Sequence, residues 1–314
     1  MSVSGTGPYH GGNRYNTYGA FLRQKFGCRV FKVSVDAGFT CPNRDGTLGV
    51  GGCTYCSNES FLPPSADRGL PLRLQIDGGA EFLRRRFRAE KIIVYFQPFS
   101  NTHAPLDRLV PLYEEALSHE GVVGISIGTR ADCVDEGKIA WLESLARRTF
   151  MTLEYGLESV YDGTLKRINR GHDFACFLDA LKLTQNRGVF LAAHVILGFP
   201  WESREEILEM AHVISGLGLD FLKLHHLHVL RDTPLGLEYS RRPFPLPSLD
   251  EYVALVVEFL ERLSPDIKVE RLFGQAPEAQ LLGPHWGRSR AQLRRAVEDQ
   301  LEARQTYQGR LCRY

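Results

Sequence analysis

The sequence lacks the features that mark membrane, fibrous and disordered proteins. Its 314 residues contain no apolar run near the roughly 20 residues of a membrane span, and the opening MSVSGTGPYHGGNRY has no apolar signal-peptide core. Basic and acidic residues nearly balance at a formal net charge of +1, which excludes a polyanion binder that acts through bulk charge alone. We therefore expect a cytoplasmic globular protein without membrane contact.

Cysteine is scarce and unevenly placed. An odd total of seven cysteines, in a chain too long to need disulfide staples, favours a reducing compartment in which clustered thiols bind metals or perform redox chemistry. Ordinary packing is expected for the four isolated ones, Cys28, Cys133, Cys176 and Cys312. The glycine-rich segment FTCPNRDGTLGVGGCTYCSNESF contains the other three, Cys41, Cys53 and Cys56.

Short β-branched or aromatic runs alternate with longer amphipathic segments. Strands are predicted at 29–35, 91–97, 122–128, 151–158, 190–198 and 221–230. Helices are predicted at 72–87, 105–120, 134–148, 173–188 and 203–218. This alternation predicts an α/β fold, a partial (β/α)6 TIM-like barrel, in which the loops after the strands form the active site.

The two ends of the chain depart from this repeat. Residues 1–28 are predicted to form a short N-terminal extension, 29–235 the partial barrel, and 236–314 a helical C-terminal extension that packs on it. Within the last part, 248–286 predicts a helix and a short strand that closes the side of the barrel, and 287–314 predicts a final basic helix.

The three clustered cysteines directly follow the first predicted strand. A structural zinc site needs four ligands, usually in two pairs, and no second CxxC or HxxxH follows close by. An iron-sulfur cluster on three thiolates leaves one iron open for a small molecule, and the glycines let the loop wrap around a bulky inorganic core. The spacing favours a cluster, with zinc and plain structural cysteines as the alternatives.

The segment resembles the cluster loop of radical S-adenosylmethionine (SAM) enzymes, whose CxΦC half matches CTYC with Tyr55 as the aromatic residue. The first gap departs from the commonest form, because eleven residues separate Cys41 from Cys53. CPNRDG, GGCTYCSNESF, YGLES and NRGHDF together resemble one subgroup, bacterial proteins related to the radical domain of the Elongator catalytic subunit, which acts on tRNA wobble uridines. The resemblance runs from about Tyr15 to the end of the chain.

The resemblance implies that Cys41, Cys53 and Cys56 hold a [4Fe-4S] cluster whose open iron binds SAM, with Tyr55 packed near the cluster and the adenine. A one-electron donor such as flavodoxin or ferredoxin would then drive cleavage of SAM to a 5′-deoxyadenosyl radical. The implied substrate is a tRNA wobble uridine, with a carboxymethylaminomethyl group processed toward aminomethyl. The alternatives are a radical SAM enzyme that acts on a small metabolite and a non-catalytic zinc-binding RNA adaptor.

Basic residues near both ends agree with an RNA substrate. The last predicted helix carries Arg294 and Arg295, and the N-terminal segment mixes basic residues with Tyr15, Tyr18 and Phe21. This composition suits phosphate contact and base stacking, although solvated basic helices are common.

Further SAM contacts are predicted from positions at the ends of strands. FQPFSNT lacks the glycines of the superfamily's methionine-binding turn, so Gln97 and Asn101 are the predicted substitutes. Arg130 suits a two-point contact with the SAM carboxylate, and its alternative is a surface salt bridge with Asp132 or Asp135.

The fourth and fifth predicted strands supply the remaining candidates. By resemblance, Glu158 and Ser159 contact the ribose or methionine part of SAM, while Ile196 covers the adenine and Gly198 permits close backbone approach. Glu154 is expected to be buried against a basic partner.

Histidines form the last group of candidates. His194 is expected to be a hydrogen-bonded core residue rather than a catalyst. On the sixth predicted strand, His226 and His228 should point one way and Lys223 and His225 the other, which argues against a three-histidine metal site. They are predicted to line a polar barrel mouth, with His226 near SAM, or else to pack in the core.

Overall fold

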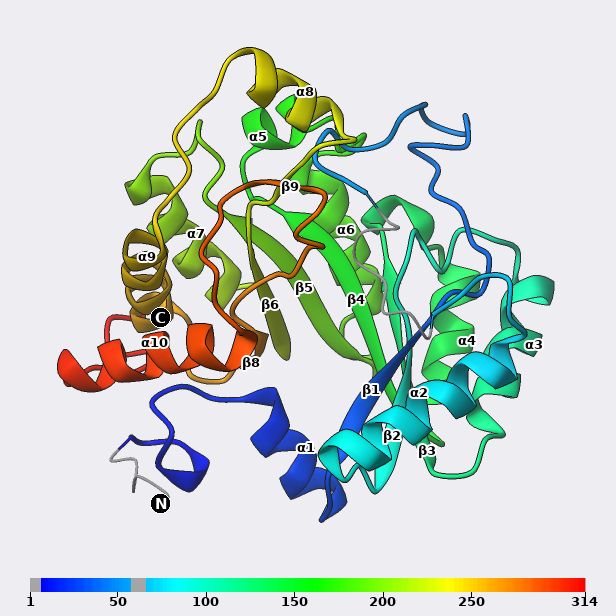
Figure 1. The fold of residues 1–314 in the computed structure, drawn as a ribbon. Coiled ribbons are helices and arrows are strands. Elements are labelled where there is room, and N and C mark those ends of the chain that lie inside the picture. Colours follow the sequence, from blue (N-terminus) through cyan, green and yellow to red (C-terminus); the bar gives the residue numbers. More distant parts are fainter. Residues whose placement is uncertain (1–6, 58–65, 314) are drawn as a thin grey trace.

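The computed structural model describes residues 7–57 and 66–313, in which a parallel sheet curls into a half-barrel with helices on its outer face (Figure 1). The sheet has the order β1-β2-β3-β4-β5-β6-β8, and each neighbouring pair is parallel. Its strands are β1 (Val30–Val35), β2 (Lys91–Phe96), β3 (Val122–Thr129), β4 (Phe150–Glu158), β5 (Phe190–Leu197), β6 (Phe221–His226) and β8 (Lys268–Arg271). The predicted partial barrel is confirmed, and β8 is the predicted short strand at its side.

Helices follow the strands in the predicted order, with ends shortened by a few residues. They are α1 (Tyr18–Phe26), α2 (Leu72–Phe87), α3 (Leu106–Leu117), α4 (Glu136–Ala146), α5 (Asp162–Arg167), α6 (Phe174–Thr184), α7 (Arg204–Ser215), α8 (Pro234–Arg241), α9 (Leu249–Arg262) and α10 (Arg290–Ala303). Short 3-10 turns occur at η1 (His10–Gly12) and η3 (Ala131–Cys133). Ser203, Ser248 and Ser289 begin α7, α9 and α10 with capping boxes, which explains those starting points. None of the helices in the described ranges is long and apolar enough to cross a membrane.

The two faces of the sheet carry different side chains, because residues alternate along each strand. Outward-facing residues such as Val94, Ile127 and Leu153 are fully buried against the helices and belong to the main hydrophobic core. The inner face is polar in its middle and aromatic near its lower end. Lys32 on β1 and Glu270 on β8 pair at 2.7 Å, so the two edge strands approach each other across the open side.

Helix α1 closes the lower, N-terminal end of the half-barrel. Tyr18 packs edge-on and Phe21 at a tilt against the Phe221 ring, and Phe150 and Phe190 complete this aromatic plug. Tyr18 is buried and Phe21 is partly buried. These N-terminal aromatics were predicted to stack on RNA bases, but the structure uses them in the core, because the lower barrel opening must be filled with apolar surface.

The predicted strand 221–230 is divided. Strand β6 ends at His226, and after a break the chain forms β7 (Val229–Leu230), which pairs antiparallel with β9 (Leu281–Gly283) in a separate two-stranded sheet. An uninterrupted run of β-forming residues gave no sign of this break, because the change of partner depends on residues more than 50 positions away.

Candidate cluster and SAM site

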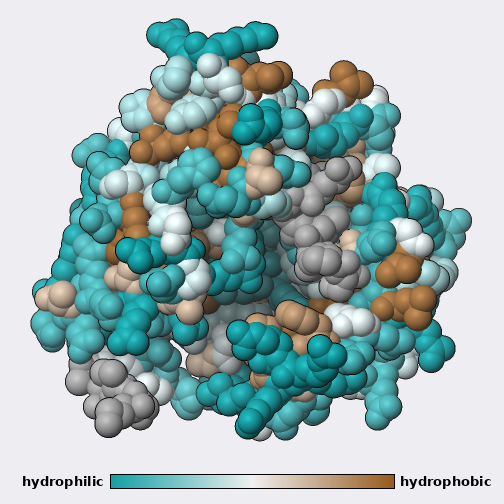
Figure 2. Space-filling view, in the orientation of Figure 1, coloured by the Kyte–Doolittle hydropathy of each residue, from teal (hydrophilic) through white to brown (hydrophobic). Residues whose placement is uncertain are grey.

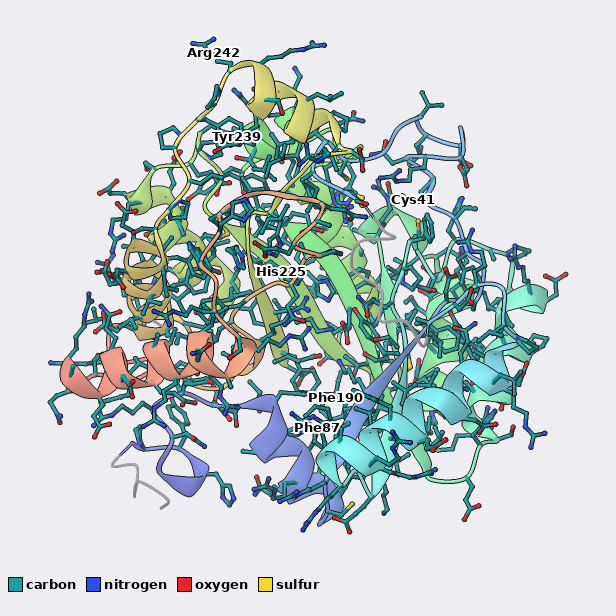
Figure 3. The ribbon with its side chains drawn as sticks, viewed as in Figure 1. Cys41, Phe87, Phe190, His225, Tyr239 and Arg242 are labelled. Atoms are coloured by element: carbon teal, nitrogen blue, oxygen red, sulfur yellow. The ribbon has the colours of Figure 1, made fainter. Side chains whose placement is uncertain are left out.

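The cysteine loop begins where β1 ends, at the upper edge of the sheet, and Cys41 lies at that end of the molecule (Figure 3). Cys53 is buried, whereas Cys41 and Cys56 are partly exposed. Burial, followed by the neighbouring Cys53, raises the pKa of Cys56 to about 12, and burial also raises the pKa of Cys41. The three thiols therefore lie within electrostatic reach of one another and must lose protons when they bind iron.

A second loop, just before α6, holds the cysteine loop in place. Asn43 donates a side-chain N–H to the Asn169 carbonyl at 2.6 Å, and Asn169 donates one to the Gly52 carbonyl at 2.9 Å. The Thr54 amide donates to the Ile168 carbonyl at 2.8 Å. CPNRDG and NRGHDF, which are far apart in the sequence, thus interlock at this site.

Arg170 places a buried positive charge beside the thiols. Its Nη1 lies 3.8 Å from Cys53 Sγ, and its Nη2 donates to the Gly156 carbonyl. Burial by itself would lower the pKa of Arg170, but the charges of Cys53 and Glu158 raise it above its usual range. Sequence reasoning left this motif undecided between helix capping and function. The structure confirms the capping, because Asp173 caps α6, and it places Arg170 beside Cys53; a function of this motif stays a prediction.

Arg130 has partners other than the predicted SAM carboxylate. Its Nε and Nη2 donate to the two oxygens of Asp132 at 2.8 and 2.6 Å, and its Nη1 donates to the Arg170 carbonyl at 2.8 Å. These contacts occupy the two-point geometry that a SAM carboxylate would need. The structure therefore corresponds to the alternative partner Asp132, although the pair is buried rather than on the surface, and Arg130 supports the loop that carries Arg170.

The loop after β2 is held by its own hydrogen bonds. Asn101 is buried, and its side-chain N–H groups point to the carbonyls of Phe96, Pro98 and Gly128 at 2.9–3.1 Å. Asn101 thus shapes the loop, which speaks against its predicted contact with SAM. Gln97 is partly exposed just beyond β2, and its predicted contact with SAM stays a prediction.

Glu158 ends β4 in a conformation that re-aims its side chain. Its φ is 69°, in the left-handed region, and the register between β4 and β5 shifts between Gly156 and Glu158. Burial, followed by the charge of Glu158, raises the pKa of Tyr55 well above its usual range. A carboxylate is therefore held close to the cysteine loop, at the cost of backbone strain that often marks functional sites. The predicted contact of Glu158 with SAM stays a prediction.

Ser159 contacts a residue that sequence reasoning missed. Its hydroxyl donates to Glu202 Oε1 at 2.5 Å, and Glu202 Oε2 is buried without a partner in the described ranges. Burial raises the pKa of Glu202 to about 7. Glu202 lies just beyond the loop after β5, and no motif in the sequence singled it out.

The predicted adenine-binding residues lie close to the cysteine loop. Ile196 and Tyr55 belong to one small hydrophobic cluster with Phe199, whose ring centroid is 6.4 Å from that of Tyr55. Gly198 follows β5 with φ 95°, a conformation that glycine adopts without strain. The structure therefore brings Ile196 and Gly198 to the same end of the barrel as Tyr55.

His226 lies on the other face of β6 from Lys223 and His225, as the strand period predicted. Its ring packs against Trp286 at 4.2 Å and Tyr252 at 5.4 Å between centroids, in the layer outside the sheet. This placement speaks against the predicted contact of His226 with SAM. Packing, the other predicted role, is what the structure shows.

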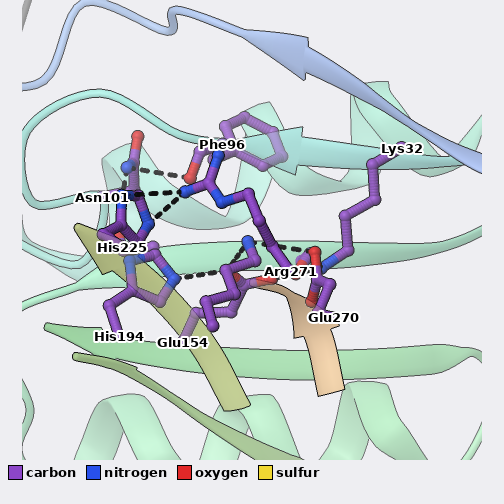
Figure 4. A network of polar contacts seen from close by, with 11 residues as sticks. Lys32, Phe96, Asn101, Glu154, His194, His225, Glu270 and Arg271 are labelled. Carbon is purple, nitrogen blue, oxygen red and sulfur yellow. Dashed lines mark hydrogen bonds and ion pairs between the residues drawn. The ribbon is translucent and has the colours of Figure 1, made fainter. Parts of the chain in front are cut away.

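The interior below the cysteine loop contains a buried network of charges (Figure 4). Glu154 accepts hydrogen bonds from Lys32, Lys223 and, at 2.9 Å, His194. Burial alone would raise the pKa of Glu154, but the two lysines hold it well below its usual range. Glu270 pairs with the same lysines at 2.7 and 3.1 Å. The expected basic partners of Glu154 and the core role of His194 are both present.

The donor set fits an iron-sulfur cluster. Within the described ranges, no three His, Cys, Asp or Glu side chains converge tightly enough for one metal ion, whereas a cubane spreads its thiolates over separate irons. Asn43 and Arg170 direct N–H groups toward Cys53 Sγ at 3.9 and 3.8 Å, and such donors tune iron-sulfur centres. Cys41, Cys53 and Cys56 are therefore the residues that fit the cluster.

Comparison with known proteins agrees with this geometry. The profile of the radical SAM superfamily matches residues 41–214, and that of the radical SAM C-terminal domain matches 219–303. YtqA of Bacillus subtilis (strain 168) is 37% identical over 297 residues, covering 95% of this chain and 92% of YtqA. YhcC of Escherichia coli (strain K12) is 33% identical over 276 residues, 88% of each chain. The chain belongs to the radical SAM superfamily.

Within the superfamily, the chain is related to Elongator protein 3. Elongator complex protein 3 of Schizosaccharomyces pombe is 26% identical over 180 residues, 56% of this chain and 32% of that protein. The archaeal Elp3 structure of Methanocaldococcus infernus has a TM-score of 0.67 at 18% identity, covering 89% of this chain and 64% of that one. This chain thus spans about a third of the first protein and slightly less than two thirds of the second. It is a radical SAM enzyme that uses a [4Fe-4S] cluster and SAM.

Proposed function

We propose that this enzyme modifies the wobble uridine of tRNA and processes a carboxymethylaminomethyl group toward aminomethyl. The relation to Elongator protein 3 carries the proposal. Two of the sequence motifs that resemble this family, CPNRDG and NRGHDF, form the interlocked loops around Cys53 rather than a remote surface. The motifs that carry the resemblance therefore lie at the proposed reaction site.

The roles of the site residues follow from their positions. Cys41, Cys53 and Cys56 would hold the cluster, which, when bound and reduced, supplies the electron that cleaves SAM. Arg170 places a positive charge beside Cys53 Sγ and would donate an N–H to this sulfur when it binds the cluster. A one-electron donor such as flavodoxin or ferredoxin is the proposed reductant.

The SAM side of the site is proposed from the ends of β4 and β5. Glu158 and Ser159 would contact the ribose or methionine part, and Ile196 with Tyr55 would cover the adenine. Ile196 and Tyr55 share one apolar cluster at the barrel mouth, a suitable environment for a flat aromatic base.

The tRNA surface is proposed to include the basic face of α10. Arg294 and Arg295 are exposed by 63% and 73%, and among the described residues their ion pairs are with Glu298 and Asp299, one helical turn away. Exposed pairs of this kind contribute little to stability, so phosphates can replace the acidic partners at small cost.

The first test is SAM cleavage by anaerobically reconstituted protein with dithionite. We expect 5′-deoxyadenosine release that rises with bulk bacterial tRNA and disappears in Cys53→Ala, since removing one thiolate breaks the cluster site. Cys312→Ser, which changes a cysteine remote in sequence from the cluster loop, is the matched control and should retain release. A colourless zinc protein without sulfide would contradict the enzyme assignment.

The second test separates tRNA from a small substrate. Nucleosides of tRNA treated with the enzyme are analysed by mass spectrometry for loss of the carboxymethylaminomethyl form. Arg294→Glu combined with Arg295→Glu should raise the KM for tRNA and reduce its salt dependence. SAM cleavage that is indifferent to tRNA, with turnover intact in the double variant, would favour the small-metabolite alternative.

A further inference from the structure

The charged interior contains one more basic residue, Arg271, than its paired lysines and carboxylates account for. The two buried carboxylates, Glu154 and Glu270, are both engaged by the lysines Lys32 and Lys223. Two negative charges thus balance two positive ones. Arg271, the last residue of β8, makes no ion pair within 4.0 Å in the part of the chain that the structure describes, and its Nε is buried without a hydrogen-bond partner.

The neighbours of Arg271 add no negative charge. Its Nη2 donates to the ring of His225, whose pKa is held well below its usual range by burial and by Arg271, so that the ring is neutral. His228 is likewise neutral, because burial and Arg271 lower its pKa to about 4. Desolvation and the charge of Arg271 also lower the pKa of Arg290, the first residue of α10. A guanidinium in this setting is destabilised until an anion joins it.

The surroundings of Arg271 are closed on the side of Gly274. Gly274 approaches the imidazoles so closely that a Cβ there would lie 2.6 Å from His228 and 3.2 Å from His225. Arg271 itself is only partly buried. Figure 2 shows a hollow at the centre of this face with hydrophilic residues inside it, and Figure 3 places His225 in the middle of the same view. The group can therefore be reached from solvent.

The position of Arg271 separates it from Glu158 and Ser159, two of the predicted SAM contacts. Those two lie at the end of β4, whereas Arg271 pairs in register with Lys223 on the far side of β6, and its partner His225 is in register with Ile196 of β5. An anion at Arg271 would thus sit across the interior from Glu158 and Ser159. Of the two partners that enter the interior, the substrate rather than SAM is the one expected on this side.

We propose that Arg271, beside His225, binds the carboxylate at the end of the substrate's C5 substituent. This inference rests on the proposed function, in which that substituent is carboxymethylaminomethyl. A guanidinium suits a carboxylate because it offers two parallel N–H groups. Holding the end of the chain here would place its methylene groups between Arg271 and the SAM side of the barrel.

Turnover by the reconstituted holoenzyme gives the first test. The substrates are tRNA that bears carboxymethylaminomethyluridine and the same tRNA with the carboxylate converted to its methyl ester. We expect a KM at least about 30-fold higher for the ester, and a similar rise for Arg271→Gln with the acid, because one partner of a charge pair is lost. Arg271→Lys should recover part of this loss, and the exposed Arg147→Gln is the matched control.

Binding without turnover gives the second test. Calorimetry compares the affinities of 5-carboxymethylaminomethyluridine and 5-aminomethyluridine for the holoenzyme and for Arg271→Gln. The acid should bind the wild type more tightly, and the variant should lose that preference.

Equal affinities, or equal turnover of acid and ester, overturn this inference while the proposed function stands. A tenfold loss of SAM affinity in Arg271→Gln would assign the anion to SAM. A higher KM of Arg271→Gln for tRNA that is the same for acid and ester would assign the anion to a phosphate of the RNA backbone. Absence of turnover with any tRNA would overturn the proposed function itself.

Discussion

The lower end of the barrel interior is lined by aromatic side chains, and the upper end by charged ones. The lower end is an aromatic plug in which Tyr18 and Phe21 of α1 pack on Phe221. The upper end and the middle contain buried charges, including Glu154 and Arg170. Apolar burial stabilises a fold without directional demands, whereas buried charges cost free energy unless each is paired. The lower end therefore depends on apolar packing, whereas the charges of the middle and the upper end depend on their partners.

Breaking the charged middle should have the largest effect on the fold. Glu154→Gln leaves Lys32 and Lys223 with Glu270 as their shared carboxylate, so we expect a loss of about 3–5 kcal/mol in the free energy of unfolding. Chemical denaturation of the variant and of the exposed control Glu115→Gln measures the difference. Equal stability of the two variants would show that the network is not what holds the middle of the barrel.

The upper end should also respond to pH. The folded protein raises the pKa of Glu202 to about 7 from an ordinary value of 4.5, so its contribution to stability is present below pH 4.5 and is lost as pH rises through about 7. At pH 8, Glu202→Gln should therefore be more stable than the wild type by on the order of 2 kcal/mol.

Thermal unfolding at pH 4 and pH 8 checks this difference. The variant and the wild type should nearly converge at the lower pH, because the carboxyl is then mostly neutral in both states. Glu205→Gln, at an exposed position in the first turn of α7, is the control. A gain for Glu202→Gln that is the same at both pH values would contradict the assignment to ionisation.

Arg170 should affect the cluster more than the fold. Arg170→Gln removes the charge next to Cys53 Sγ, and loss of such a supporting group typically costs about 10–100-fold in metal affinity or activity. Iron retained after gel filtration under a chelator challenge is the measurement, and Arg167→Gln on exposed α5 is the control. Full iron retention in Arg170→Gln would limit Arg170 to holding the loop.

Substitution in the aromatic plug should have the smallest effect. In contrast to substitution of Arg170, it should lower the stability of the fold and leave the cluster intact. Phe221→Leu is expected to cost about 1–2 kcal/mol of stability through lost packing, with iron content and SAM cleavage per folded molecule unchanged. The exposed Phe82→Leu should leave the stability within about 0.5 kcal/mol of the wild type. A loss of iron in Phe221→Leu would contradict the conclusion that the lower end of the barrel acts independently of the cluster site.

Local patterns were sufficient for much of the fold. The predicted helix 72–87 agrees with α2 at both ends, and the six predicted strands all occur. The cysteine loop was also found from the sequence, because thiols at short spacing in a glycine-rich segment have few other uses. These features depend on residues close together in the chain.

Contacts between distant segments were harder to predict. Arg170 and Cys53 are 117 positions apart, and nothing near either residue indicates that they meet. The N-terminal aromatics had the composition of a base-stacking surface, but the need to fill the lower barrel opening places them in the core. Arg130 likewise has a side chain suited to binding a carboxylate. The sequence predicted the carboxylate of SAM, whereas in the structure the partner is Asp132.

The sequence by itself determined the order of strands and helices, the three thiols and the family to which they belong. These follow from periodicity and from short motifs, which act over a few residues. Only the tertiary structure decided which charges are paired, which aromatics are buried and that Arg271 has no carboxylate within 4.0 Å among the described residues. Such pairings depend on the curling of the sheet, which brings Lys32 of β1 within reach of Glu270 of β8 across the open side, and a chain cannot express this curvature locally.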